Sequence, residues 1–127
     1  MAVKVIDTSA LAAVAFAEPD GQRIAAQLGE HDLIAPHLLP FELANVCLTK
    51  IRRHPVKKQL LLAGYEMVSR LPLTFMAVNV TEVVTLAEAK KLTAYDASFL
   101  WLARQLDVES VTLDKTLAKR VNPRKAK

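Results

Sequence analysis

The sequence predicts a three-layer α/β domain with a central parallel sheet of four to five strands and helices on both faces. Short runs of β-branched and apolar residues alternate along the chain with segments of helical periodicity. That order is typical of parallel strands joined by crossover helices. The chain has 127 residues, the usual size of one domain, so we expect a single domain over residues 1–127.

The expected strands are short apolar runs that stop at a turn signal or an acid. The first run halts at Asp7 and the last at Asp114. The expected strands are residues 2–6, 32–35, 74–78 and 110–113.

Capping residues and prolines mark the expected helices. Asp7 offers a cap to the first helix, and Pro40 suits the first turn of a later one. Thr81 is expected to cap one helix and Asp96 to begin the next. The expected helices are residues 10–17, 22–28, 41–51, 57–71, 82–92 and 97–106, followed by a short helix and a basic tail, 122–127, expected to be disordered.

The composition favours a cytoplasmic protein without a membrane anchor. Cys47 has no partner for a disulfide and lies in an apolar stretch, so we interpret it as a buried side chain in a reducing compartment. The apolar residues 10–17 are too few to span a bilayer, which takes about 20. Only Lys4 precedes them as a cation, so we expect a core helix rather than a signal peptide.

Four acids fall where an α/β fold places its working site. Asp7 and Asp114 directly follow expected strands, and Glu42 and Asp96 lie at the start of expected helices. In such folds the site lies beyond the carboxyl ends of the strands. We therefore expect these carboxylates to meet at one rim of the sheet.

Each acid also has a purely structural interpretation. Asp7 and Asp96 suit helix N-caps, and Glu42 in a first turn is favoured by the helix dipole. Asp114 can simply start a turn. The combination favours chemistry, because strand-terminal acids at both ends of the chain pair with two helix-leading acids.

Mutual repulsion restricts what a four-acid rim can be. Two like charges about 4 Å apart repel by roughly 4 kcal/mol at an effective dielectric near 20. Oxygen ligands without nearby Cys or His favour a hard ion, so we expect one or two Mg²⁺ or Mn²⁺ ions. Such ions bind phosphates and lower the pKa of a water nucleophile, which suits phosphodiester hydrolysis.

Three polar side chains are expected to support the acids. Ser9 lies beside Asp7, and Thr112 is two residues before Asp114, so on a strand both would point the same way. Asn45 follows Glu42 at helical spacing. Each can orient a carboxylate or a metal-bound water.

A basic stretch follows the second acid. The net charge is +4, which fits a polyanionic partner without requiring one. Lys50, Arg52 and Arg53 form a track that could guide a single RNA strand, although a solvated basic surface is an equally good interpretation for each residue.

Four segments resemble the ordered motifs of PIN-domain nucleases, and of the VapC-like toxin group in particular. They are residues 5–11 (VIDTSAL), 40–46 (PFELANV), 92–100 (LTAYDASFL) and 111–117 (VTLDKTL). All four acidic positions are kept. The resemblance implies Mg²⁺- or Mn²⁺-dependent RNA cleavage, a homodimer, and inhibition by a small antitoxin protein.

Other classes fit less well. A phosphoacceptor receiver domain would need paired acids after the first strand, where Asp7 stands alone, and the His and Cys residues show no zinc-ligand spacing. An RNA-processing exonuclease without an antitoxin, and a catalytically silent PIN module that binds RNA or protein, remain as alternatives. The sequence does not identify the RNA target or separate endonuclease from exonuclease action.

Overall fold

A parallel sheet forms the middle layer of the protein. The structure, a computed structural model, describes residues 2–29, 31–114 and 117. Within them the sheet has four strands in the order β3-β2-β1-β4, and every neighbouring pair is parallel. The strands are β1 (Ala2–Ile6), β2 (His31–Pro36), β3 (Leu73–Met76) and β4 (Ser110–Val111).

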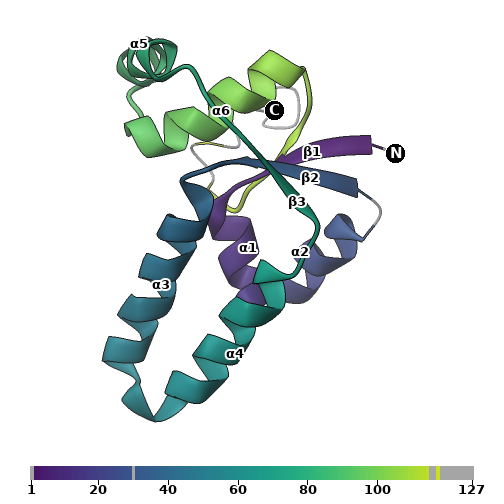
Figure 1. The fold of residues 1–127 in the computed structure, drawn as a ribbon, viewed down its shortest axis with the longest axis vertical. Coiled ribbons are helices and arrows are strands. Elements are labelled where there is room, and N and C mark those ends of the chain that lie inside the picture. The colour runs from purple at the N-terminus through teal and green to yellow at the C-terminus, as the bar shows by residue number, and fades with distance from the viewer. Residues whose placement is uncertain (1, 30, 115–116, 118–127) are drawn as a thin grey trace.

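Helices cover both faces of this sheet, which confirms the three-layer α/β class. Helices α5 and α6 lie on one side, and the four helices α1 to α4 lie on the other (Figure 1). In the described part of the chain no helix is both long and apolar enough to cross a membrane. The helices are α1 (Thr8–Ala15), α2 (Gly21–Leu28), α3 (Leu39–Arg53), the 3-10 turn Pro55–Lys57, α4 (Lys58–Ser69), α5 (Val80–Lys90) and α6 (Ala94–Leu106).

The strand order contains a topological switch. From β1 the chain steps to β2 and then β3 on one side, whereas β4 returns to pair with the other side of β1. The crossover that leaves the carboxyl end of β1 therefore covers one face of the sheet, and the crossover that leads into β4 covers the other (Figure 1). Open α/β folds bind their ligands in the crevice at such a point.

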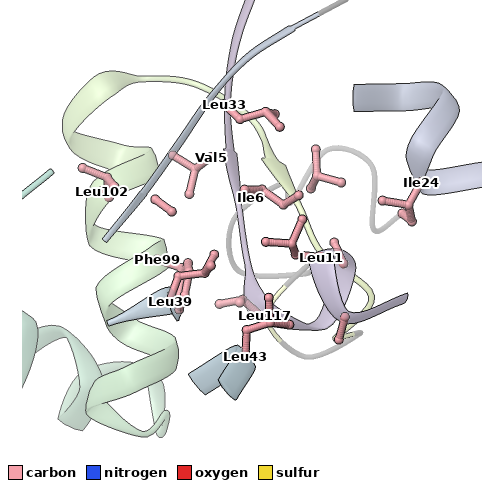
Figure 2. Close-up of a cluster of buried hydrophobic side chains, with 14 of the residues drawn as sticks. Val5, Ile6, Leu11, Ile24, Leu33, Leu39, Leu43, Phe99, Leu102 and Leu117 are labelled. Atoms are coloured by element: carbon pink, nitrogen blue, oxygen red, sulfur yellow. The ribbon is translucent and has the colours of Figure 1, made fainter. Parts of the chain in front are cut away.

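The core is aliphatic, as the scarcity of aromatic residues in the sequence requires. Val5 and Ile6 on β1 are fully buried, with Phe99 and Leu100 of α6 also in the same cluster (Figure 2). Cys47 is 4% exposed, and its Sγ lies 3.8 Å from the Leu61 carbonyl oxygen, which confirms its expected burial. Burial on both faces of β1 fixes the strand that leads directly into Asp7.

Helices α3 and α4 form an antiparallel pair that extends away from the sheet (Figure 1). Gly64 of α4 is in close contact with the end of α1. A Cβ on Gly64 would lie only 2.0 Å from the Ala15 carbonyl oxygen, so any side chain there would force the helices apart. This contact joins the projecting pair to the helix that begins beside Asp7.

Two helix caps differ from those that the sequence predicts. Asn79, and not Thr81, caps α5, because its Oδ1 accepts the Glu82 N–H at 3.1 Å. Thr93 caps α6 by accepting the Asp96 N–H at 3.0 Å, so Asp96 lies in the first turn instead of beginning the helix.

The last strand is shorter than expected. β4 ends at Val111, so Thr112 and Asp114 follow the strand and do not share one of its faces. The helix expected after Asp114 and the tail 122–127 lie, apart from Leu117, outside the described residues.

Candidate active site

Asp7 is held at the junction of β1, β4 and α1. Its backbone N–H donates to the Val111 carbonyl at 3.1 Å, which ties the end of β1 to the end of β4. Its side chain is the N-cap of α1 and accepts the Ala10 N–H at 3.1 Å. The residue is only 4% exposed, so its carboxylate is a buried charge on rigid secondary structure.

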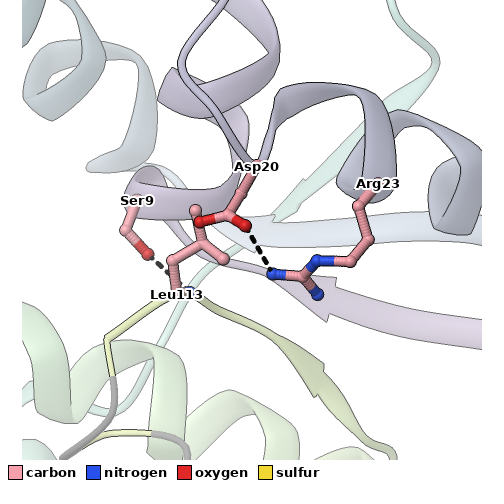
Figure 3. Close-up of polar contacts among 4 residues, drawn as sticks. All are labelled: Ser9, Asp20, Arg23 and Leu113. Carbon is pink, nitrogen blue, oxygen red and sulfur yellow. Dashed lines mark hydrogen bonds and ion pairs between the residues drawn. The ribbon is translucent and has the colours of Figure 1, made fainter.

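Two hydroxyl groups hold the Asp7 carboxylate from either side. Ser9 Oγ donates to Oδ1 at 2.8 Å, and Thr112 Oγ1 donates to Oδ2. Ser9 Oγ also accepts the Leu113 N–H at 2.9 Å (Figure 3), and Thr112 Oγ1 accepts the Asp114 N–H at 3.0 Å. Two of the three predicted supporting residues, Ser9 and Thr112, therefore connect the start of α1 to the segment that carries Asp114, although Thr112 does so from beyond the strand.

The Asp20–Arg23 pair drawn in the same view is separate from this network. Their side chains form an exposed ion pair at 3.2 Å at the start of α2 (Figure 3). It joins residues three apart in the chain and stabilises only the local turn.

Glu42 accepts a hydrogen bond from Thr8, which is not among the site residues that the sequence predicts. It lies in the first turn of α3, where its Oε1 accepts the Thr8 hydroxyl at 2.7 Å. The available signal was the run of three hydroxyl- or carboxyl-bearing residues at positions 7–9, of which only the outer two were selected.

Asp96 and Asp114 complete the set. Asp96 is half-buried in the first turn of α6. Asp114 Oδ1 accepts the Leu117 N–H at 3.0 Å, so this acid does have the turn-forming contact that its structural interpretation predicts. That bond occupies one of its oxygens and leaves the residue part-buried at the same edge of the sheet.

Three acids of the rim have a raised pKa. Burial is the main cause for Asp7, Glu42 and Asp96 alike, and it raises the pKa of each above its usual value. The charge of Asp114 raises the pKa of both Asp7 and Asp96 further, and Asp96 and Asp7 do the same to Glu42. The structure thus brings the four carboxylates to one rim, where they repel each other.

No basic side chain relieves this repulsion in the described part of the chain. The ion pairs formed there join Lys4 to Glu109, Arg23 to Asp20, and Lys50 to Glu18. None of them involves an acid of the rim. The charge is therefore offset only by hydrogen bonds from hydroxyl and backbone N–H groups.

The donor set suits a hard divalent cation, although the acids do not form a closed cage. Among the described residues no three Asp, Glu, His or Cys side chains are placed close enough to hold one ion together. Mg²⁺ commonly keeps several waters and takes only one or two carboxylates directly. The rim fits that mode, in which some acids would bind the ion and others its waters.

The expected RNA track leads away from the rim along α3. Asn45 is exposed about one turn after Glu42. Arg52 and Arg53 are also exposed, and they lie roughly 16 Å from Glu42 along the helix axis, at about 1.5 Å per residue. Lys50 turns toward the end of α1 instead. Its Nζ pairs with Glu18 Oε2 at 2.9 Å and lies 5.8 Å from the centre of the Phe16 ring.

A solved structure has a similar fold, and the sequence matches a family model. The crystal structure of PAE2754 from Pyrobaculum aerophilum has a TM-score of 0.72 against this chain, at 25% sequence identity, over 96% of this chain and 89% of that one. No match was found among curated proteins. Residues 4–122 match the PIN domain family, a span that includes all four acids and both supporting hydroxyls. The chain belongs to the PIN domain family.

Proposed function

We propose that this protein is a metal-dependent ribonuclease, acting as an endonuclease, with a site formed by Asp7, Glu42, Asp96 and Asp114. The observation that carries the proposal is that four mutually repelling carboxylates share one rim at the topological switch of the sheet. Membership of the PIN domain family supports nuclease chemistry in general. The proposal that the substrate is RNA rests in addition on the resemblance of the four sequence motifs to those of PIN-domain ribonucleases.

The chain's own residues supply positioning and charge. Asp7, fixed by Ser9 and Thr112, offers a carboxylate of defined direction, and Glu42 and Asp96 face the same region from two helix starts. A bound Mg²⁺ or Mn²⁺ ion would supply an activated water and neutralise charge on the phosphate. None of the acids needs to act as a separate general base.

We further propose that the protein is the toxin of a toxin–antitoxin pair in the cytoplasm, and that a groove away from the acids binds the antitoxin. The groove, of about 580 Å³, lies between α1 and the α3–α4 pair. Phe16, Leu60 and Met67 make its walls apolar, and Lys50 and Lys57 are also among its lining residues. An amphipathic acidic segment would match both features.

A homodimer is proposed on a different surface. Val80 and Val84 lie one helical turn apart on α5 and are 67% and 58% exposed. Val80 and the exposed Tyr95 border one apolar hollow of about 410 Å³. Exposed apolar side chains gathered in this way are typical of protein–protein contacts.

Asp96→Asn is expected to abolish RNA cleavage without unfolding the protein, because it removes one charge from the rim and keeps the side-chain shape. Cleavage of total RNA by the purified variant, with ends mapped, measures this. Asp32→Asn is the matched control, since Asp32 is exposed on β2 and lies in register with Val3, at the far end of β1 from Asp7. Full cleavage by the Asp96 variant would remove this acid from the site.

The same variant is expected to melt a few degrees higher than the wild type when both are free of metal at neutral pH. A carboxyl group whose pKa is raised on folding favours the folded state while protonated, and this contribution is lost as pH rises through the folded pKa. The stability of the wild type should therefore increase as the pH falls through the raised pKa of Asp96 toward its usual value of 3.8, and it should increase less in the variant.

Adding Mn²⁺ should reverse the order of the two melting temperatures, so that the wild type melts above the Asp96→Asn variant. An ion present at about 100 times its Kd adds roughly 2.7 kcal/mol to stability, so the wild type should melt higher in Mn²⁺ and the Asp96 variant should gain much less. Thermal melting over a metal titration measures both effects. A wild-type melting temperature that does not change with Mn²⁺ concentration would show that the rim does not bind the ion.

Leu60→Asp is expected to prevent binding of the antitoxin and to leave RNA cleavage intact. Leu60 is 72% exposed in the groove, and a new negative charge there would repel an acidic partner. Co-expression with the neighbouring reading frames, followed by co-purification and a cleavage-inhibition assay, measures the effect. A partner that still inhibits the Leu60→Asp protein would place its binding elsewhere.

Val84→Asp is expected to convert a dimer to a monomer, because it places a charge in the proposed apolar contact. The mass in solution by light scattering measures this. Leu60→Asp and Val84→Asp serve as controls for each other, since the two surfaces are separate. A wild-type protein that is monomeric at high concentration would contradict the dimer.

A further inference from the structure

Thr8 forms the direct side-chain contact between the first turns of α1 and α3. Its Oγ1 donates to Glu42 Oε1 at 2.7 Å, across 34 positions in the sequence. The donor group is an uncharged hydroxyl and the acceptor is a carboxylate, so the bond is charge-assisted when Glu42 is ionised. Such bonds are shorter and stronger than bonds between neutral groups.

Helix capping does not account for this hydroxyl. The N-cap of α1 is Asp7, whose side chain already accepts the Ala10 N–H, and Thr8 is the first helical residue. Among the described residues the Thr8 hydroxyl has no backbone hydrogen-bond partner, and its hydrogen bond goes to Glu42. A valine would have the same shape and β-branching but could not donate this hydrogen bond. The hydroxyl is therefore what distinguishes Thr8 from an apolar residue at this position.

Glu42 needs such a partner more than Asp7 does. Asp7 has a short side chain with three hydrogen bonds, from Ala10, Ser9 and Thr112. Glu42 has a longer side chain that loses more rotational freedom when it is ordered. Within the described part of the chain its carboxylate accepts a hydrogen bond from Thr8 alone.

We propose that Thr8 is a positioning residue that holds the Glu42 carboxylate toward the metal-binding rim. This inference rests on the proposed function, because it assumes that Glu42 binds a divalent ion or one of its waters. The bond uses one lone pair of Oε1 and leaves the other lone pairs of the carboxylate for an ion or its waters. Side chains that orient a metal ligand in this way commonly change metal affinity by roughly tenfold or more when removed.

The test compares four single variants in Mn²⁺ titrations followed by thermal melting. Thr8→Val and Thr8→Ala remove the hydroxyl, and Thr8→Ser keeps it. Thr85→Val is the matched control, because Thr85 is an exposed helical threonine whose hydroxyl bonds to the Thr81 carbonyl of its own helix. Steady-state cleavage at saturating and limiting Mn²⁺ gives a second readout.

We expect the Val and Ala variants to need about tenfold more Mn²⁺ for the same stabilisation and for half-maximal cleavage. At saturating metal their cleavage rate should approach that of the wild type, because the ligand itself remains. Thr8→Ser should stay within about twofold of the wild type, as should Thr85→Val. Loss of the threonine hydroxyl can lower the metal-free melting temperature of Thr8→Val and Thr85→Val alike, so the test compares the Mn²⁺ concentration that each protein needs.

Two results would overturn the inference. One is a Thr8→Val or Thr8→Ala protein with wild-type Mn²⁺ affinity, and the other is a Thr8→Ser protein as weak as Thr8→Ala. Failure of the proposed function has a different signature, since the wild type would then show no Mn²⁺-dependent stabilisation at all. The Ala variant keeps the test decisive if the Val variant does not fold.

Discussion

The buried carboxylate of Asp7 is the constraint on which the arrangement of the site depends. An ionised group at this depth is tolerated only when hydrogen bonds replace the lost water. Those bonds come from the first turn of α1 and from Thr112 after β4, two segments about a hundred residues apart in the sequence. Satisfying one charge therefore fixes the position of the strand end, the helix start and the loop that carries Asp114. The fold and the site share the same hydrogen bonds.

The rim weakens the metal-free protein, and the core offsets this cost. Burial raises the pKa of three acids, so ionising any one of them costs more free energy in the folded state than in the unfolded chain. β1 leads into the rim with Val5 and Ile6 fully buried between two layers of helices. Packing of this density resists local movement, so the acids cannot relieve their repulsion by separating. A site that must bind a cation benefits from ligands that are held in place before the ion arrives.

Much of this arrangement could be predicted from local patterns, because strand ends and helix starts have recognisable sequences. Asp7 and Asp114 follow β-rich runs, and their meeting at one edge follows from the alternation of strands and helices. The start of α6 was harder to predict, since Thr93 and Asp96 are both residues that commonly cap helices, and the structure uses Thr93. The Thr8–Glu42 bond and the pairing of Lys50 with Glu18 depend on how helices pack. No local signal contains that information.

In the described part of the chain no acid of the rim forms an ion pair with a basic side chain, which distinguishes the rim from a purely structural cluster of acids. A structural cluster of acids is normally paired with Lys or Arg, and this chain has cations available, with a net charge of +4. The described ion pairs place three of those cations, Lys4, Arg23 and Lys50, against other acids. Hydroxyl and backbone donors orient the carboxylates without neutralising them. A hydrated divalent ion is a species whose ligand preference these acids fit.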